Sequence, residues 1–285
     1  MSQASSSEPL VTKAAGRKGR KTTRVGSAPL TGFQTGLISL LTVFFMLAVW
    51  MAVTHLGLVK PLFLPKLETI LKAFTDAMEG KIDGAPLAEH ITASLFRVIS
   101  AFVLAALIGI PVGLAMGISP AIRAMLDPFI EFYRPLPPLA YLPLVIIWFG
   151  IGETSKVLLI FLACFAPVAL AARAGVLSAS SDQINAARAL GASRLQLLCF
   201  VVFPAALPDI LVGLRIGMGV GWTTLVAAEM VAASTGVGQM VLNASNFLRT
   251  DIVMMGIFVI GGFAILFEFA MRWLEKKLVP WRGKA

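Results

Sequence analysis

Residues 185–204 read Asn-Ala-Ala-Arg-Ala-Leu-Gly-Ala-Ser-Arg-Leu-Gln-Leu-Leu-Cys-Phe-Val-Val-Phe-Pro and lie between two long apolar runs. Ser181 and Asp182, just before this stretch, are typical of a helix start. The small alanine side chains let such a helix enter a groove, Gly191 permits a turn or a close approach, and Pro204 is expected to end the helix. Two interpretations of this polar segment stay open: an amphipathic helix at a membrane surface, and a helix that docks into a partner.

The apolar runs on either side of the polar segment indicate an integral membrane protein. Of the 285 residues, 58% are hydrophobic and 14% are charged, whereas soluble domains are about half apolar and about a quarter charged. Lipid offers no hydrogen-bond partner to the backbone, so spanning segments are helices or parts of a closed barrel. The runs are continuously apolar over about 20 residues and do not alternate as barrel strands do, which favours helices.

We therefore predict an all-α integral membrane protein, a polytopic bundle of about six transmembrane helices. The expected spans lie near residues 36–54, 94–118, 128–149, 156–177, 207–232 and 252–273. The first of these is longer than the apolar core of a signal peptide and is interpreted as a retained span.

The distribution of basic residues predicts the orientation. The formal net charge is +9, and we interpret it as the positive-inside pattern of a membrane protein rather than as a surface for nucleic acid. Basic residues gather before the first span, around the polar segment and at the C-terminus, so the N-terminus is predicted to be cytoplasmic. The expected organisation is a disordered basic tail over 1–32, a transmembrane domain over 33–278 that contains the polar segment at 178–205, and a cytoplasmic tail over 279–285.

Residues 57–93 are predicted to lie on the outer side and to include an amphipathic helix. Apolar residues from Leu67 to Met78 recur at helical spacing with charges between them, which is typical of a helix in the membrane interface; an external ligand site is the alternative. His55 and His90, in or beside this segment, are interpreted as interfacial or surface histidines. No metal-type spacing, nucleotide loop or catalytic set is recognisable in the sequence, so no catalytic residue, cofactor or metal ligand is predicted.

Glycines at intervals of four residues predict close helix packing in two of the spans. They are Gly109, Gly113 and Gly117 in the second span and Gly213, Gly217 and Gly221 in the fifth. Static packing within one bundle and a moving or dimeric interface are both compatible with this pattern.

Four prolines between Arg134 and Pro143 interrupt the third predicted span. A broken helix at membrane depth survives where protein or a water-lined cavity satisfies its backbone groups, so this stretch is either a pathway element or a kinked packing helix. Glu229, inside the fifth span, either faces a pathway or pairs with a hydroxyl or an arginine on another helix. Arg215 belongs to the same predicted helix, too far along it to be that partner.

The polar segment resembles the Glu-Ala-Ala–Gly–Ile–Leu-Pro loop of the permeases of ATP-binding-cassette importers. The residues that fit that pattern are Ala186, Ala187, Gly191 and Pro204, and those that depart from it are Asn185, Val201 and Phe203. From about Leu62 to Trp281 the chain is similar to the taurine, alkanesulfonate and nitrate branch of this family. The segments that carry this similarity are 126–140, 148–156, 213–217 and 221–229.

The resemblance implies the type I ABC importer permease fold and a role as the permease subunit of an ATP-driven importer in a bacterial inner membrane. The implied partners are cytoplasmic ATPase subunits, a periplasmic binding protein and a second permease chain, most simply as a homodimer. Taurine is the expected substrate, with alkanesulfonate, nitrate or another small oxyanion as alternatives. The residues expected to couple the chain to the ATPase are Asn185, Ala186, Ala187, Gly191 and Pro204. The candidate pathway residues are Tyr141, Trp222, Thr223 and Glu229.

Two other functional classes are alternatives to a permease subunit. A channel or an ion-coupled transporter would need no ATPase. An integral-membrane enzyme would show a cluster of catalytic residues near one interface, and the sequence shows none.

Overall fold

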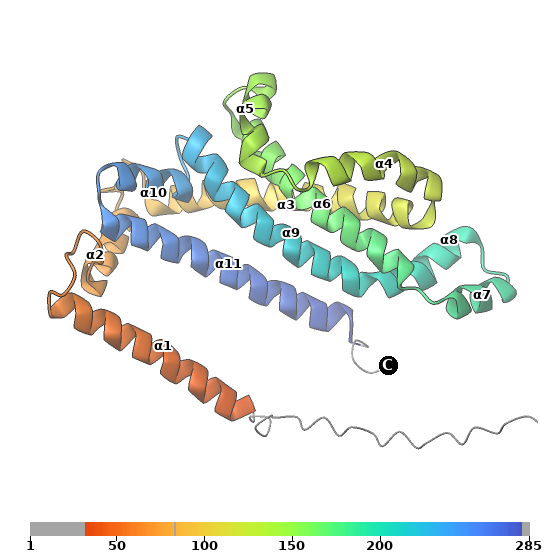
Figure 1. Cartoon of the computed structure of the whole chain (residues 1–285), viewed down its shortest axis with the longest axis horizontal. Coiled ribbons are helices and arrows are strands. Elements are labelled where there is room, and N and C mark those ends of the chain that lie inside the picture. Colours follow the sequence, from red (N-terminus) through yellow and green to blue (C-terminus); the bar gives the residue numbers. More distant parts are fainter. Residues whose placement is uncertain (1–31, 83, 281–285) are drawn as a thin grey trace, which may run out of the picture. The chain divides into compact units, whose positions relative to one another are not determined.

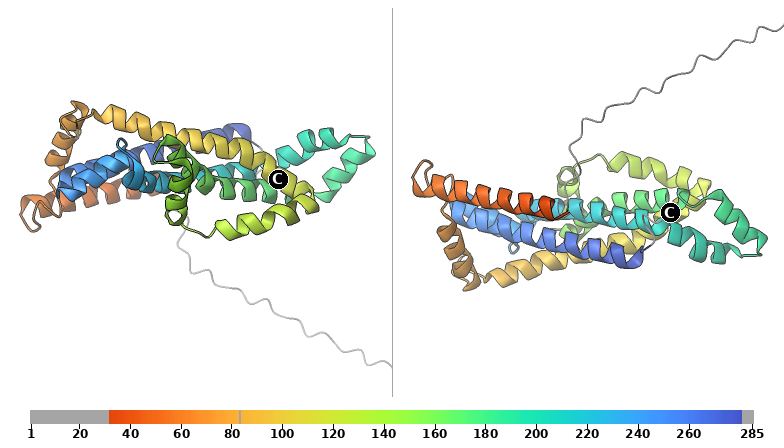
Figure 2. Two further views of the ribbon diagram at one scale, coloured as in Figure 1. Left: turned by 90° about the horizontal axis from the view of Figure 1, so that it is seen from above. Right: turned by 90° about the horizontal axis from the view of Figure 1, so that it is seen from below.

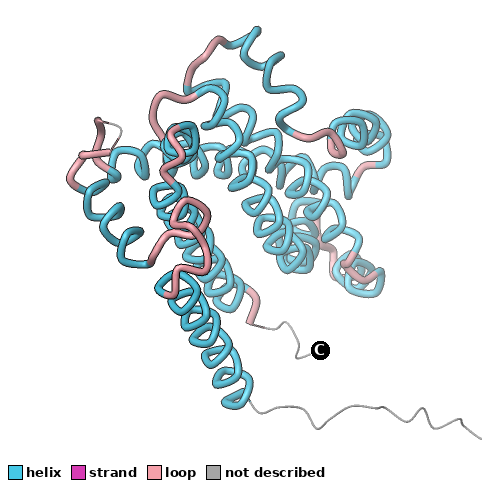
Figure 3. Tube along the Cα trace, turned by 60° about the vertical axis from the view of Figure 1, so that its left-hand side comes forward, coloured by secondary structure: helices cyan, strands magenta, loops and turns pink. Residues whose placement is uncertain are grey.

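The computed structural model describes residues 32–82 and 84–280, which form helices joined by loops and turns (Figures 1 and 3). Of the predicted N-terminal tail, 1–32, residues 1–31 lie outside the described residues, as do residues 281–285 of the predicted C-terminal tail, 279–285. The chain divides into one unit that ends at Trp50 and a second that begins at Met51. The described part of the first unit belongs to α1 (Gly32–His55), a helix long and apolar enough to cross a membrane.

In the described residues, five helical segments have the length and hydropathy of membrane spans. They are Phe33–His55, Leu87–Ile118, Glu153–Leu177, Arg194–Ala232 and Thr250–Leu278. These segments confirm five of the six predicted spans, with the helices extending beyond the predicted ends.

The third predicted span, 128–149, is wrong as a single helix. The structure has two shorter helices in its place, α4 (Pro120–Tyr133) and α5 (Pro138–Phe149), separated by a turn. Prolines explain the break, because a residue before proline disfavours the helical conformation and proline itself donates no hydrogen bond. Pro138 instead lies in the first turn of α5, where a missing N–H group costs nothing.

The centre of the second unit is α6 (Glu153–Leu177), which packs between α3 (Leu87–Ile118) and α9 (Phe203–Ala232) (Figure 1). Both glycine series face α6. A Cβ atom on Gly113 would lie 2.2 Å from the carbonyl oxygen of Ala169, and one on Gly213 would lie 2.2 Å from the Cβ atom of Ala171. The predicted close approach is confirmed, and the glycines serve packing within one bundle.

Two short helices lie at the end of this unit where α3 begins. The predicted amphipathic helix is α2 (Leu67–Met78), which buries Ile70, Ala73 and Ala77 and contacts α11 (Thr250–Leu278) and α3. After α9 the chain turns into the short helix α10 (Val237–Asn246), which packs on α9 and α11. At the opposite end lie α7 (Ser181–Ala189) and α8 (Arg194–Leu197), which project beyond the packed helices (Figures 1 and 2).

Candidate functional site

The polar segment forms two helices rather than the one that was expected. The hydroxyl oxygen of Ser180 accepts a hydrogen bond from the backbone N–H of Gln183 and begins α7 one residue before the predicted start signals. Ser193 and Gln196 then cap α8 reciprocally through their side chains and backbone N–H groups. Because both helices have their own caps, the fold of this projecting segment is set locally.

Gly191 makes the turn between the two helices. Its φ angle of +81° lies in the left-handed region, and its backbone N–H donates to the carbonyl of Arg188 at 2.9 Å. The next N–H, of Ala192, donates to the carbonyl of Ala187 at 3.0 Å. This pair of bonds is the Schellman arrangement that ends helices at a glycine. A Cβ atom on Gly191 would meet no atom within 4 Å, so the position is open on the surface of the chain.

Pro204 does not end a helix, contrary to the expectation. The chain stays helical from Arg194 to Ala232, with a π-helical turn over Leu198–Val202 directly before α9. In this wider turn the N–H of Phe203 donates to the carbonyl of Leu198, five residues earlier. A π turn changes the hydrogen-bond register just before the proline, which lets the helix continue past a residue that has no N–H.

The residues predicted to couple the chain to a partner lie together on this segment. Asn185, Ala186 and Gly191 are exposed, whereas Ala187 and Pro204 are half-buried. Three large apolar side chains of the segment are also exposed: Leu190 by 89%, Leu195 by 71% and Phe200 by 78%. A projecting, locally capped segment with open small residues and exposed leucines has the features of a docking element.

The four candidate pathway residues are not brought together. Tyr141, on α5, lines a cavity between α4, α5, α6 and α9. Trp222 and Thr223, on α9, line a different cavity of about 560 Å³ between α9 and α11, which Arg215 and Glu268 also line. Glu229 lines neither of these cavities. Their pathway role stays a prediction.

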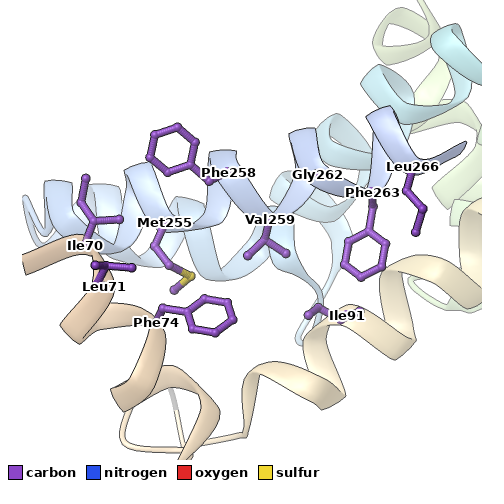
Figure 4. Close-up of a pocket in the computed structure, with 10 residues that line it drawn as sticks. All are labelled: Ile70, Leu71, Phe74, Ile91, Met255, Phe258, Val259, Gly262, Phe263 and Leu266. Atoms are coloured by element: carbon purple, nitrogen blue, oxygen red, sulfur yellow. The ribbon is translucent and has the colours of Figure 1, made fainter. Parts of the chain in front are cut away.

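A third cavity, of about 420 Å³, lies between α2, α3 and α11 and is apolar throughout (Figure 4). Its lining residues are Ile70, Leu71, Phe74, Ile91, Met255, Phe258, Val259, Gly262, Phe263 and Leu266. No side chain here can hydrogen-bond to or neutralise a polar solute, so its chemistry suits hydrocarbon and not a hydrophilic cargo.

Glu229 is buried in an ion-pair network at the end of the unit opposite α7 and α8. Its carboxylate accepts hydrogen bonds from the Arg97 guanidinium at 2.6 Å and from the Ser94 hydroxyl at 2.7 Å. Arg97 also donates to both oxygens of Glu153, at 2.6 and 2.8 Å, and Glu153 pairs with Lys156 at 2.8 Å. The sequence left open whether Glu229 faces a pathway or pairs with a hydroxyl or an arginine on another helix. The structure shows it paired with both a hydroxyl and an arginine.

The charges of this Arg97 network balance, because two cations, Arg97 and Lys156, meet two carboxylates, Glu153 and Glu229. The side chains of Arg97 and Glu229 are each 1% exposed. An unpaired charge at such a position costs several kcal/mol. Arg97 and Glu229 can therefore be buried in the bundle because the network neutralises their charges. The sequence predicted, as one of two alternatives, that Glu229 pairs with a hydroxyl or an arginine on another helix, but it did not identify Arg97 and Ser94 as these partners, nor Glu153 and Lys156 as further members of the network.

The turn between α9 and α10 is fastened to the Arg97 network. Arg97 donates to the carbonyl of Thr235 at 2.7 Å, and the N–H of Gly238 donates to Glu229 at 2.8 Å. A Cβ atom on Gly236 would lie 2.5 Å from the Glu229 carboxylate, so only glycine allows the turn to come this close. His90 also packs here, with its Nδ1 atom 3.1 Å from the backbone N of Gly236. It is 1% exposed, and its interpretation as a surface histidine was wrong.

Comparisons with known proteins agree with this architecture. Residues 105–280 match the family described as binding-protein-dependent transport system inner membrane component. The chain is 55% identical to the taurine transport system permease protein TauC of Escherichia coli (strain K12) over 248 residues, which cover 87% of this chain and 90% of that protein. It is 36% identical to the putative aliphatic sulfonates transport permease protein SsuC of Bacillus subtilis (strain 168) over 238 residues, covering 83% and 84%.

A solved structure shares the fold. A chain of the MetNI methionine ABC transporter, in an inward-facing conformation, matches with a TM-score of 0.59 and 18% identity over 67% of this chain and 95% of that chain. This confirms the predicted permease fold. The match of residues 105–280 and the extended identity to curated permeases lead to one conclusion: the chain belongs to the family of inner-membrane components of binding-protein-dependent transport systems.

Proposed function

We propose that this permease carries taurine across the bacterial inner membrane in an ATP-driven importer. The observation that supports taurine as the substrate is the 55% identity to a taurine permease over 87% of the chain, compared with 36% identity to a putative aliphatic sulfonate permease. Longer alkanesulfonates are the second candidate, because a putative sulfonate permease is also similar over most of the chain. Nitrate or another small oxyanion would be a third.

The projecting segment of α7 and α8 is the proposed link to the ATPase. Asn185, Ala186, Ala187 and Gly191 offer a surface that a groove on a cytoplasmic ATPase subunit fits, while the half-buried Pro204 lies where the segment joins α9. ATP binding closes the two ATPases, moves the segment and opens the pathway toward a docked, loaded binding protein; hydrolysis resets it. Such coupling requires that the ATPase bind the two states of the permease with different affinity.

The proposed assembly has two copies of this chain, two ATPases and one periplasmic binding protein. The N-terminus and the tail after residue 278 lie in the cytoplasm, with the polar segment 178–205 on the same side. The Arg97 network and α2 then lie on the outer side. The basic residues around the polar segment and at the C-terminus support this orientation.

Reconstitution tests the substrate. The permease, its ATPase and its binding protein are placed in proteoliposomes, and uptake of labelled taurine, a longer alkanesulfonate and nitrate is measured with and without ATP. We expect ATP-dependent uptake with preference for taurine. Uptake without the ATPase would indicate a channel or an ion-coupled transporter. Preference for another anion would show that this anion, and not taurine, is the substrate.

A matched pair of glycine variants tests the docking role. Gly191 and Gly57 both have a positive φ angle, +81° and +68°, and open space where a Cβ atom would lie. Aspartate fits both backbones about equally well, so neither change should prevent membrane insertion. We expect Gly191→Asp to lose ATPase co-purification and uptake, and Gly57→Asp to keep the ATPase. Normal co-purification and uptake with Gly191→Asp would refute the docking role.

A further inference from the structure

A cavity of about 420 Å³ opens between α4, α5, α6 and α9 at the middle depth of the spans. Its α6 residues run from Leu162 to Ala171, near the centre of Glu153–Leu177, and its α9 residues, Ile216 and Val220, lie near the centre of that helix. The break between α4 and α5 forms part of its wall, through Arg134, Leu136 and Pro138. Irregular backbone at such depth is expected where it lines a cavity.

Two phenols and one guanidinium supply the polar side-chain groups of this cavity. The chain has two tyrosines, and both of them, Tyr133 and Tyr141, line this cavity. The hydroxyl of Tyr133 is buried and has no hydrogen-bond partner among the described residues. A buried hydroxyl without a partner is unfavourable, and phenylalanine would fill the same space without that cost. A solute that reached this hydroxyl would supply the missing partner.

The charge of the lining favours an anion. Among the described residues that line the cavity, Arg134 is the one charged side chain, and no carboxylate is present. Its ion pair with Glu131 is long, 3.9 Å, and both side chains are more than half exposed, so it neutralises Arg134 weakly. The neighbouring cavity beside Trp222 differs, because Arg215 there is already paired with Glu268 and Glu275.

The same cavity also has groups that can bind a cation close to the anion. Pro167 has no N–H, so the carbonyl of Ala163 lacks its usual donor within α6, and both residues line the cavity. The two phenol rings add faces that attract an ammonium group. A small zwitterion with a sulfonate at one end and an ammonium at the other matches this set of groups.

We propose that this cavity is a transit site for a small aminosulfonate, in which the Tyr133 hydroxyl and the Arg134 guanidinium donate hydrogen bonds to the sulfonate oxygens. The ammonium group faces the Ala163 carbonyl and the Tyr141 ring. The proposal rests on the import of a small sulfonate and adds the residues that hold the solute between release from the binding protein and exit. Few donors suffice, because a transit site must also let its solute leave.

The test is Tyr133→Phe in the full reconstituted complex with saturating loaded binding protein. The measured quantity is taurine taken up per ATP hydrolysed. We expect at least a roughly tenfold lower ratio, the value of one hydrogen bond to a charged group, with no loss of thermal stability because the removed hydroxyl has no partner in the chain. Arg134→Gln should lower the ratio as well, and Arg134→Lys should retain part of it.

Phe132→Leu is the matched control, since Phe132 precedes Tyr133 on α4 but is 74% exposed and does not line the cavity. It should leave the ratio unchanged. A normal ratio with Tyr133→Phe, or a loss that accompanies a lower melting temperature, would overturn the transit site while wild-type uptake still supports the substrate. Absence of taurine uptake by the wild-type complex would instead overturn the proposed function.

Discussion

Removing either end of the buried Arg97–Glu229 pair should destabilise the chain, but by unequal amounts. In Arg97→Met, Glu229 keeps the Ser94 hydroxyl and the Gly238 N–H but loses its cation. In Glu229→Gln, Arg97 keeps two hydrogen bonds to Glu153 and one to the carbonyl of Thr235. The arginine therefore stays paired when the glutamate is removed, whereas the glutamate does not stay paired when the arginine is removed.

The magnitudes follow from these remaining partners. Breaking a buried ion pair so that one charge is uncompensated costs about 3–5 kcal/mol, and this applies to Arg97→Met. The loss of one hydrogen bond to a charged group costs about 1.5–3 kcal/mol, and this applies to Glu229→Gln. The double variant Arg97→Met/Glu229→Gln leaves no buried carboxylate at position 229 and should recover part of the larger loss, which a double-mutant cycle measures as coupling.

Unfolding of the purified permease in detergent, followed by denaturant titration and by thermal melting, checks the order. The expected ranking of stability is wild type first, Glu229→Gln second and Arg97→Met last, with the double variant above Arg97→Met. Equal losses for the two single variants, or strictly additive losses in the double variant, would show that Arg97 and Glu229 do not depend on each other as the geometry requires.

Three further outcomes are expected. Gly113→Val should lower stability by several kcal/mol and reduce the yield of folded protein, because its side chain would overlap the carbonyl of Ala169; a melting temperature equal to wild type would contradict the close packing on α6. Gly236→Ala should cost about 1–3 kcal/mol by straining a φ angle of +137° and pushing on Glu229, and unchanged hydrogen exchange in the α9–α10 turn would refute this. Gly191→Val should destabilise the turn by about 1–2 kcal/mol and Gly191→Asn by less, since asparagine tolerates the left-handed conformation; proteolysis of the α7–α8 turn compares the two.

The features that the sequence predicted correctly are those that depend on local patterns. Continuous apolar runs located five spans, and the spacing from Leu67 to Met78 located α2. The glycine series predicted close approach because a missing Cβ atom has the same effect wherever the helix packs. The pattern did not identify the helix against which each glycine series packs. The structure shows that both series pack against α6.

The errors came from interactions that local patterns do not specify. The prolines after Arg134 predict a break, yet the length and composition of residues 128–149 suit a single membrane helix, and the structure has two helices there. Pro204 was expected to end a helix, but a π-helical turn accommodates it. His90 is buried because the α9–α10 turn, 146 residues later, packs over it. A sequence window does not contain that contact.

The pairing of charges in the Arg97 network could have been predicted from the sequence. Alternating spans place the beginning of α3, the beginning of α6 and the end of α9 at the same side, and these positions carry Arg97, Glu153 and Glu229. Opposite charges at one membrane depth on different helices are expected to pair, because an unpaired charge there is costly. Orientation and charge together therefore predict the pair, although neither predicts that Ser94 and Gly238 complete it.

The two ends of the second unit are joined by a continuous helix. In α9, Glu229 comes 26 positions after Phe203, which corresponds to about 39 Å at the rise of an α-helix. Glycines hold it against α6 along this length, and packed interiors deform in discrete steps rather than continuously. A push on α7 and α8 therefore reaches the Arg97 network as a displacement of the whole helix, without a relay of side chains. Breaking the network in every transport cycle would add about 3–5 kcal/mol to the step, whereas carrying it along adds nothing. We therefore expect α3, α6, α9 and the α9–α10 turn to move as one body, with the change of access arising where this body meets α4 and α5 and, in the proposed assembly, a second chain.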